Sequence, residues 1–141
     1  LYYYSKKIIT LDSVYYNYYT NSVSLCNSPF SQKSMDMLKA NDFIYDFLQQ
    51  KRIDFAPVQA IMGVNAAIYV YNKLDLNYTG ADKKMYKKQI IQNYRKWLNV
   101  VKLNGVYGLI SVKQRIKWTV FGICPHVTSI IRKRMKENAD E

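Results

Sequence analysis

The stretch that decides the fold is residues 57–74, PVQAIMGVNAAIYVYNKL. Pro57 suits the first turn of a helix, because amide groups there have no acceptor within the helix and the missing N–H costs no hydrogen bond. The apolar residues that follow surround the helix axis instead of forming one stripe; they are Ile61, Met62, Val64, Ala67, Ile68 and Val70. Because a helix without a polar face is buried, we predict that this is the central helix. Its small residues, Ala60, Gly63, Ala66 and Ala67, would let neighbouring helices approach closely.

Four more helices are predicted around the central one. Upstream, Ser31 is predicted to cap a helix that ends near Lys51. Its apolar stripe is expected to comprise Met37, Ala40, Ile44, Phe47 and Leu48. Downstream, residues 79–82 have the spacing of a capping box and open a third helix that ends at Asn104-Gly105. The stripe of this helix is Ile90, Ile91, Tyr94, Trp97, Leu98 and Val101.

The remaining elements lie at the two ends of the chain. Ser111 is predicted to cap a fourth helix to about Gly122, and Pro125 to start a fifth that runs to about Glu137. At the N-terminus, residues 8–11 and 14–19 are rich in β-branched and aromatic side chains, which favours two short strands. The predicted fold is therefore mainly α, with about five helices packed as a small bundle and a short two-stranded β element. Residues 1–27 form that β element and residues 28–141 a helical domain.

The composition excludes several classes of protein. The chain has 141 residues, is 49% hydrophobic and contains 14 tyrosines, which excludes an intrinsically disordered protein. Two distant cysteines favour neither a disulfide framework nor a zinc site. The longest nearly apolar run, residues 60–71, is shorter than the ~20 residues that span a bilayer. We therefore expect a cytoplasmic chain, and its start at Leu1 instead of Met leads us to expect a processed product or a fragment.

Residues for catalysis are scarce. His126 is the one histidine, and its place at a helix start favours a surface or capping role. Asp36, Asp42 and Asp46 lack the spacing of a metal site and are interpreted as a solvated helix face. There is no phosphate-binding Gly-Lys-Ser/Thr loop. We therefore predict neither catalytic residues nor metal ligands in this chain.

The charge of the chain is uneven. The formal net charge is +11, and residues 83–136 contain no Asp or Glu. Such a segment favours an anionic partner, which can be nucleic acid, acidic lipid or a phosphorylated substrate. The alternative is a solvated surface that serves only solubility.

Residues 6–25, KKIITLDSVYYNYYTNSVSL, carry a more specific pattern. A strand is followed by Tyr15-Tyr16-Asn17-Tyr18 and then by residues 21–24, Asn-Ser-Val-Ser. This resembles the segment that closes the catalytic domain of bacterial family 2 glycosyltransferases of the GT-A type, although Asn17 replaces the Arg common there. Residues 111–117, Cys124-Pro125 and residues 130–136 are similar to the basic helical tail of the same family.

The resemblance implies that the chain is the C-terminal part of such a transferase. The parent enzyme would transfer a sugar from a nucleotide-sugar to a polysaccharide or lipid-linked acceptor in cell-envelope polysaccharide biosynthesis, with Mg²⁺ or Mn²⁺. Its catalytic base and metal-binding carboxylates would lie in an upstream catalytic domain, which is then the first partner. Tyr16 and Tyr18 share one strand face and are candidates for acceptor contact. The alternative for these rings is packing between helices and sheet.

The last two predicted helices combine apolar stripes with cations. Val112, Ile116, Val120 and Ile123 lie along one side of the fourth, and Val127, Ile130 and Ile131 along one side of the fifth. The candidate contacts to an anionic surface are Lys113, Arg115, Lys117, Arg132, Lys133, Arg134 and Lys136. This pattern suits helices in the lipid interface, on the inner face of the cytoplasmic membrane. In the competing interpretation both stripes pack onto the helical body. Two more hypotheses are nucleic-acid binding, for which the sequence has no recognised motif, and a purely structural interaction role.

Overall fold

The computed structural model describes residues 28–53 and 55–138. In chain order its elements are η2 (Gln32–Met35), α1 (Asp36–Gln50), α2 (Ala56–Asn77), α3 (Lys83–Leu103), η3 (Val106–Leu109), α4 (Val112–Ile123) and α5 (Pro125–Glu137). The mainly helical fold with five α-helices is therefore confirmed. No strand occurs within the described ranges, and the predicted β element of residues 1–27 lies outside them.

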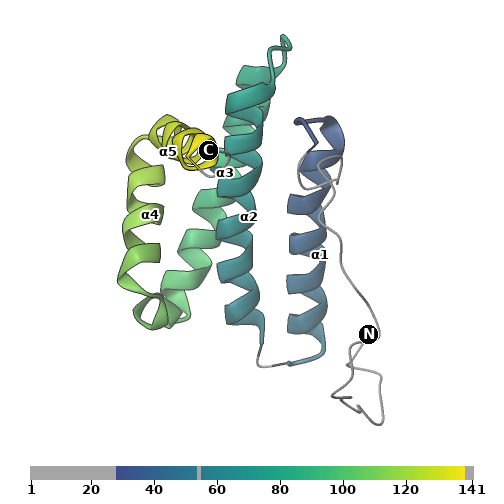
Figure 1. Ribbon diagram of the computed structural model, residues 1–141. Helices are drawn as coiled ribbons and strands as arrows, with labels where there is room; N and C mark the ends of the chain where they lie inside the picture. Colours follow the sequence, from purple (N-terminus) through teal and green to yellow (C-terminus); the bar gives the residue numbers. More distant parts are fainter. Residues whose placement is uncertain (1–27, 54, 139–141) are drawn as a thin grey trace, which may run out of the picture.

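The central position predicted for α2 is confirmed. It lies in the middle of the bundle, with α1 on one side and α3, α4 and α5 on the other (Figure 1). Its buried residues point in all directions around the axis; they include Ala60, Val64, Ala67, Ile68, Val70 and Leu74. α1 to α4 run in alternating directions, and α5 crosses the end of α4 (Figure 1).

Small residues of α2 allow the close approach that the sequence predicts. A Cβ atom added to Gly63 would lie 2.6 Å from Asn41 Nδ2 on α1 and 2.6 Å from two ring atoms of Trp97 on α3. Non-bonded carbon atoms are at their optimal separation at about 3.5–4.0 Å. The position therefore has room for a hydrogen atom only, and Gly63 sets how closely the three helices pack.

Helix ends follow the predictions at three points and differ at one. Ser111 caps α4 by accepting a hydrogen bond from the amide of Gln114 at 3.3 Å. Gly105, with φ of 69°, ends the turn after α3, and Ser31 caps η2 directly before α1. The capping box predicted over residues 79–82 is wrong, because α3 begins at Lys83 without a side-chain cap. The ring of Tyr78 lies against Gly80 in that turn instead.

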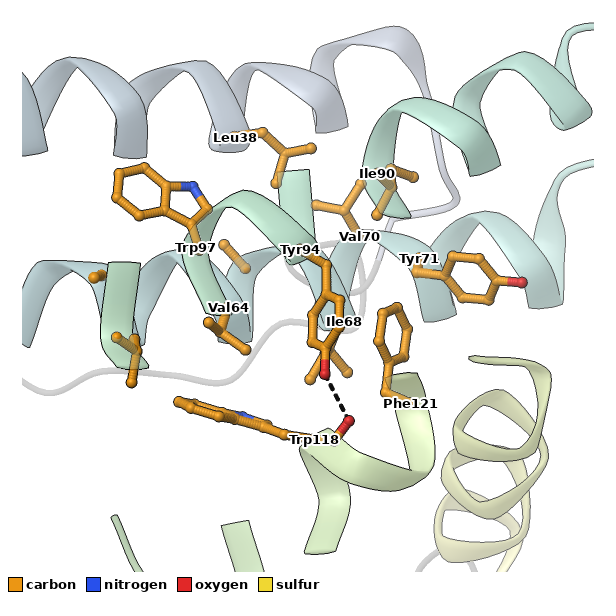
Figure 2. Close-up of a cluster of buried hydrophobic side chains, with 14 of the residues drawn as sticks. Leu38, Val64, Ile68, Val70, Tyr71, Ile90, Tyr94, Trp97, Trp118 and Phe121 are labelled. Atoms are coloured by element: carbon orange, nitrogen blue, oxygen red, sulfur yellow. Dashed lines mark hydrogen bonds between the residues drawn. The ribbon is translucent and has the colours of Figure 1, made fainter. Parts of the chain in front are cut away.

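Aromatic side chains from α2, α3 and α4 lie in the core together with aliphatic ones (Figure 2). Trp97, Trp118 and Phe121 have no exposed surface. The stripe predicted for the third helix is confirmed, since Ile90, Tyr94, Trp97 and Val101 are buried and Ile91 and Leu98 pack against them. Rings from α2, α3 and α4 thus meet in one cluster, which joins the last helices to the central one.

The stripe predicted for α1 is wrong at Met37, Ala40 and Ile44, which are exposed, while Phe47 and Leu48 are half-buried. The buried residues of α1 are Leu38 and Asn41. Asn41 faces α2 because its Oδ1 accepts a hydrogen bond from Gln59 Nε2 at 2.7 Å, beside Gly63. A polar side chain thus occupies a contact position, and the apolar face of α1 is turned partly outward.

Candidate functional site

α4 is held against the bundle by the aromatic residues of its inner face. The ring of Phe121 meets those of Tyr71 and Tyr94 edge-on, with centroids 5.2 and 4.7 Å apart. Tyr94 donates a hydrogen bond from its hydroxyl to the carbonyl oxygen of Trp118 at 2.7 Å (Figure 2). Burial raises the pKa of Tyr94 to about 12, so the hydroxyl keeps its proton at neutral pH. These contacts fix which side of α4 faces the core.

The apolar stripe of α4 lies on the opposite side of the helix. Val112, Ile116 and Ile123 are 67%, 59% and 81% exposed. Trp118 lies two residues from Ile116, and two helical steps of about 100° place the two side chains on opposite faces. The interpretation in which this stripe packs onto the helical body is therefore wrong.

α5 is attached to the bundle through polar residues. Thr128 Oγ1 and Ser129 Oγ, both in buried residues, donate hydrogen bonds to Asn72 Oδ1 of α2 at 2.9 and 3.0 Å. One turn later, the Arg132 guanidinium lies 4.8 Å from the ring centroid of Tyr69. The exposed residues of α5 include four apolar ones, Val127, Ile130, Ile131 and Met135, beside the charged residues Lys133, Arg134 and Glu137. α5 thus buries hydroxyl groups and exposes isoleucines, which at these positions reverses the polarity of an ordinary surface helix.

An ion-pair cluster holds the start of α5. The carboxylate of Asp75, at the end of α2, is 2.6 Å from Lys87 Nζ and also contacts His126 Nδ1. Burial raises the pKa of Asp75, but the hydrogen bonds from Lys87 and His126 outweigh it and hold the pKa below its ordinary value. His126 lies at the surface, as predicted, and its contact with Asp75 is a structural role that was not predicted. The sequence did not reveal its partner, because Asp75 is 51 positions away.

The predicted cations occupy different environments. Lys113, Lys117 and Arg132 border a groove between α4 and α5. Lys133 and Arg134 are exposed, and Lys133 Nζ is 3.8 Å from Glu137. Arg115 instead donates hydrogen bonds to the carbonyl oxygens of Ile110 and Gly108 at 2.8 and 2.7 Å, so its guanidinium braces the turn before α4. Tyr16, Tyr18 and the side chain of Lys136 lie outside the described part of the structure.

The groove itself was not predicted. It encloses about 750 Å³, within the range of small-molecule sites. Ile116, Val120, Ile131 and Met135 supply its apolar walls, and Asn65, Asn72 and Gln114 its polar floor. Asn65 and Asn72 are seven positions apart in the largely apolar middle of α2, which places them on one side of that helix. This spacing of two amides is the sequence signal that could have located the groove.

No candidate cluster of ligands for a divalent cation is found among the described residues. They contain no group of three or more His, Cys, Asp or Glu side chains that could hold a metal. On α1, Asp36 pairs with Lys39 at 2.9 Å and Asp42 with Lys96 at 3.1 Å. The Mg²⁺ or Mn²⁺ implied by the glycosyltransferase resemblance therefore has no ligand set within the described ranges.

Comparison with known proteins adds no family. No protein-family model, curated protein or solved structure matches this chain. Within the described ranges, every helix is too short or too polar to cross a membrane. The arguments about function therefore rest on the outer faces of α4 and α5 and on the groove between them.

Proposed function

We propose that this chain is a non-catalytic helical domain that docks on an anionic membrane surface through α4 and α5. The observation that carries the proposal is the reversed polarity of α5, whose Thr128 and Ser129 face α2 while Ile130 and Ile131 face outward. Exposed isoleucines on one helix next to exposed isoleucines on another give an apolar surface that water solvates poorly.

This outer surface combines the two attractions that hold peripheral helices on lipid. Its apolar part is Val112, Ile116, Val120, Ile123, Val127, Ile130, Ile131 and Met135. Its cationic part is Lys113, Lys117, Arg132, Lys133 and Arg134. Full burial of one such apolar side chain contributes about 1.5–3 kcal/mol, and each cation near an anionic leaflet about 1 kcal/mol. Several partly inserted side chains and a few cations are sufficient for reversible binding.

The larger protein in this proposal is a family 2 glycosyltransferase, with the chain as its C-terminal region. The support is the sequence resemblance around Tyr15-Tyr16-Asn17-Tyr18 and along the basic tail. Docking would keep an upstream catalytic domain at the membrane, where a lipid-linked acceptor is presented. Sugar transfer from a nucleotide-sugar, and the divalent cation that assists it, belong to that upstream domain.

The apolar residues favour lipid over nucleic acid as the anionic partner. The nucleic-acid backbone is contacted chiefly by cations and polar groups, and a continuous exposed aliphatic stripe gains nothing from contact with phosphates. Here Ile116 lies between Lys113 and Lys117 along α4, and its side chain is exposed.

Vesicle co-sedimentation tests the proposal on the whole chain. We expect binding to vesicles with 30% anionic lipid at low salt, and little binding to neutral vesicles. The variant Lys113→Glu/Lys133→Glu/Arg134→Glu should lose most of this binding. The matched control is Lys84→Glu/Lys88→Glu/Arg95→Glu on α3, which changes the net charge equally at exposed residues.

The outcomes separate the partners. If both triple variants lost vesicle binding equally, binding would depend only on the net charge of the chain, and the proposed surface would be overturned. A second pair of variants, Ile131→Ser and Phe43→Ser, compares an outer-surface residue with an exposed residue of α1. Only the first should weaken binding. Tight, sequence-selective binding of nucleic acid at physiological salt, without vesicle binding, would show that the anionic partner is nucleic acid and not the membrane.

A further inference from the structure

We infer that the groove between α4 and α5 binds one phosphate-bearing lipid, with acyl chains against its apolar walls and the phosphate between Lys117 and Arg132. The inference rests on the proposed membrane-docking function and names the ligand of the same surface. A flat amphipathic surface needs only many weak lipid contacts, whereas a groove can hold one lipid molecule in a defined site.

The walls of the groove suit hydrocarbon. Ile116 and Val120 are one turn apart on α4, and Ile131 and Met135 are one turn apart on α5. The two pairs border the same groove, so an acyl chain between them would contact aliphatic groups from both helices. The aromatic residues of α4 point the other way and are already buried in the core. The groove is thus apolar without being part of the hydrophobic core.

None of the three cations at the groove, Lys113, Lys117 and Arg132, is paired with an anion in the described part of the chain. Neither Lys117 nor Arg132 has a carboxylate of residues 28–53 or 55–138 within 4.0 Å. Burial, and then the charge of Arg132, lower the pKa of Lys117. The stacking of Arg132 on Tyr69 holds the guanidinium in place. A phosphate bound between the two would remove their repulsion and form charge-assisted hydrogen bonds with both.

The floor of the groove offers donors to such a phosphate. Asn65 Oδ1 already accepts hydrogen bonds from Gln114 Nε2 at 3.2 Å and Trp118 Nε1 at 3.1 Å. Asn72 Oδ1 likewise accepts from Thr128 and Ser129. With the carbonyl oxygens of both amides occupied, the NH₂ groups are the parts of these side chains that remain for a ligand. Donors favour an anionic headgroup over a cationic one.

Calorimetric titration of the full chain with short-chain lipid monomers tests this site. The probe is dihexanoyl phosphatidate below its critical micelle concentration. Two comparison ligands are dihexanoyl phosphatidylcholine, which is net neutral, and glycerol 3-phosphate, which has no chains. We expect saturable binding of one phosphatidate per chain, with both comparison ligands bound at least tenfold more weakly. Loss of a charge-assisted hydrogen bond in Lys117→Met should weaken phosphatidate binding about tenfold.

Two further variants control for charge and for shape. Lys133→Met removes an exposed cation of α5 that does not border the groove, and it should change affinity less than twofold. Val120→Trp fills the groove and should abolish binding, provided that its circular dichroism spectrum matches that of the natural chain. Non-saturable binding, equal binding of glycerol 3-phosphate, or equal effects of Lys117→Met and Lys133→Met would each overturn the inference. If vesicles bind as proposed while monomeric phosphatidate does not, the groove is refuted and the docking surface stands; absence of vesicle binding refutes the docking surface itself.

Discussion

Gly63→Ala is the substitution that most directly probes how α1, α2 and α3 meet. The new methyl group would lie 2.6 Å from Cγ and Cδ2 of Trp97 and 2.6 Å from Asn41 Nδ2. These separations are about 1 Å shorter than an ordinary carbon contact. Either the indole or the whole of α1 must move to accept the methyl group.

Two opposing effects determine how much Gly63→Ala changes the free energy of unfolding. Alanine favours a helix interior over glycine by about 1 kcal/mol. Overpacking a core costs about 1–3 kcal/mol. We expect the upper end here, because Trp97 has no exposed surface and its ring packs edge-on against Tyr45 with centroids 4.9 Å apart. The free energy of unfolding should therefore fall by about 2 kcal/mol, and the Tm by roughly 8 °C for a domain of this size.

Urea denaturation followed by far-UV circular dichroism measures this loss. Gly108→Ala is the matched control, because its Cβ would have no atom within 4 Å, and it should change stability by less than about 0.5 kcal/mol. In a Trp97→Leu background the clashing ring is absent, so Gly63→Ala should cost at least about 1 kcal/mol less, as expected for coupled neighbours. A Gly63→Ala chain as stable as the natural one would refute the close approach of these helices.

Two other predictions concern the attachment of α4 and α5. Tyr94→Phe removes the buried hydrogen bond to Trp118 and should lower stability by about 1–2 kcal/mol at pH 7, measured by urea denaturation. Because burial raises the pKa of Tyr94 to about 12 in the folded state, against about 10 in the unfolded chain, its contribution is present below about pH 10 and is lost as the pH rises towards 12. Asp75→Asn should lower stability by about 1–3 kcal/mol at pH 7. Because the pKa of Asp75 is lowered in the folded state, its contribution is present above the pKa of about 3.9 in the unfolded chain and is lost as pH falls through the folded-state value. Denaturation across pH 2–7 should thus show a weaker acid dependence in Asp75→Asn, and identical profiles would contradict the role of this ion pair.

The sequence predicted the helices well because their signals are local. The apolar residues around 57–74, the cap at Ser111 and the left-handed glycine at position 105 each specify a helix or its end within one or two turns. Which face of a helix is buried was predicted correctly for α3, where the apolar stripe is single and wide. It was predicted wrongly for α1, where Asn41 replaces an apolar residue at the contact with α2.

The candidate site could be located only from the tertiary structure. From sequence, α4 has two apolar sides, one with Trp118 and Phe121 and one with Ile116 and Ile123, and periodicity alone cannot rank them. The aromatic cluster of Tyr71 and Tyr94 decides between them, because the ring of Phe121 packs edge-on against both. The buried face of α5 is set by Asn72, which accepts hydrogen bonds from Thr128 and Ser129, 56 and 57 positions away.

The sequence by itself therefore determined the helical fold, the central helix and the basic character of the C-terminal segment, since propensity, capping and charge belong to neighbouring residues. Only the tertiary structure decided which apolar residues are core and which are surface. The buried amide of Asn72 on α2 needs hydrogen-bond partners, and it finds them in Thr128 and Ser129 on the polar side of α5. That requirement turns the isoleucines of α5 outward and, with the exposed stripe of α4, creates the surface and the groove.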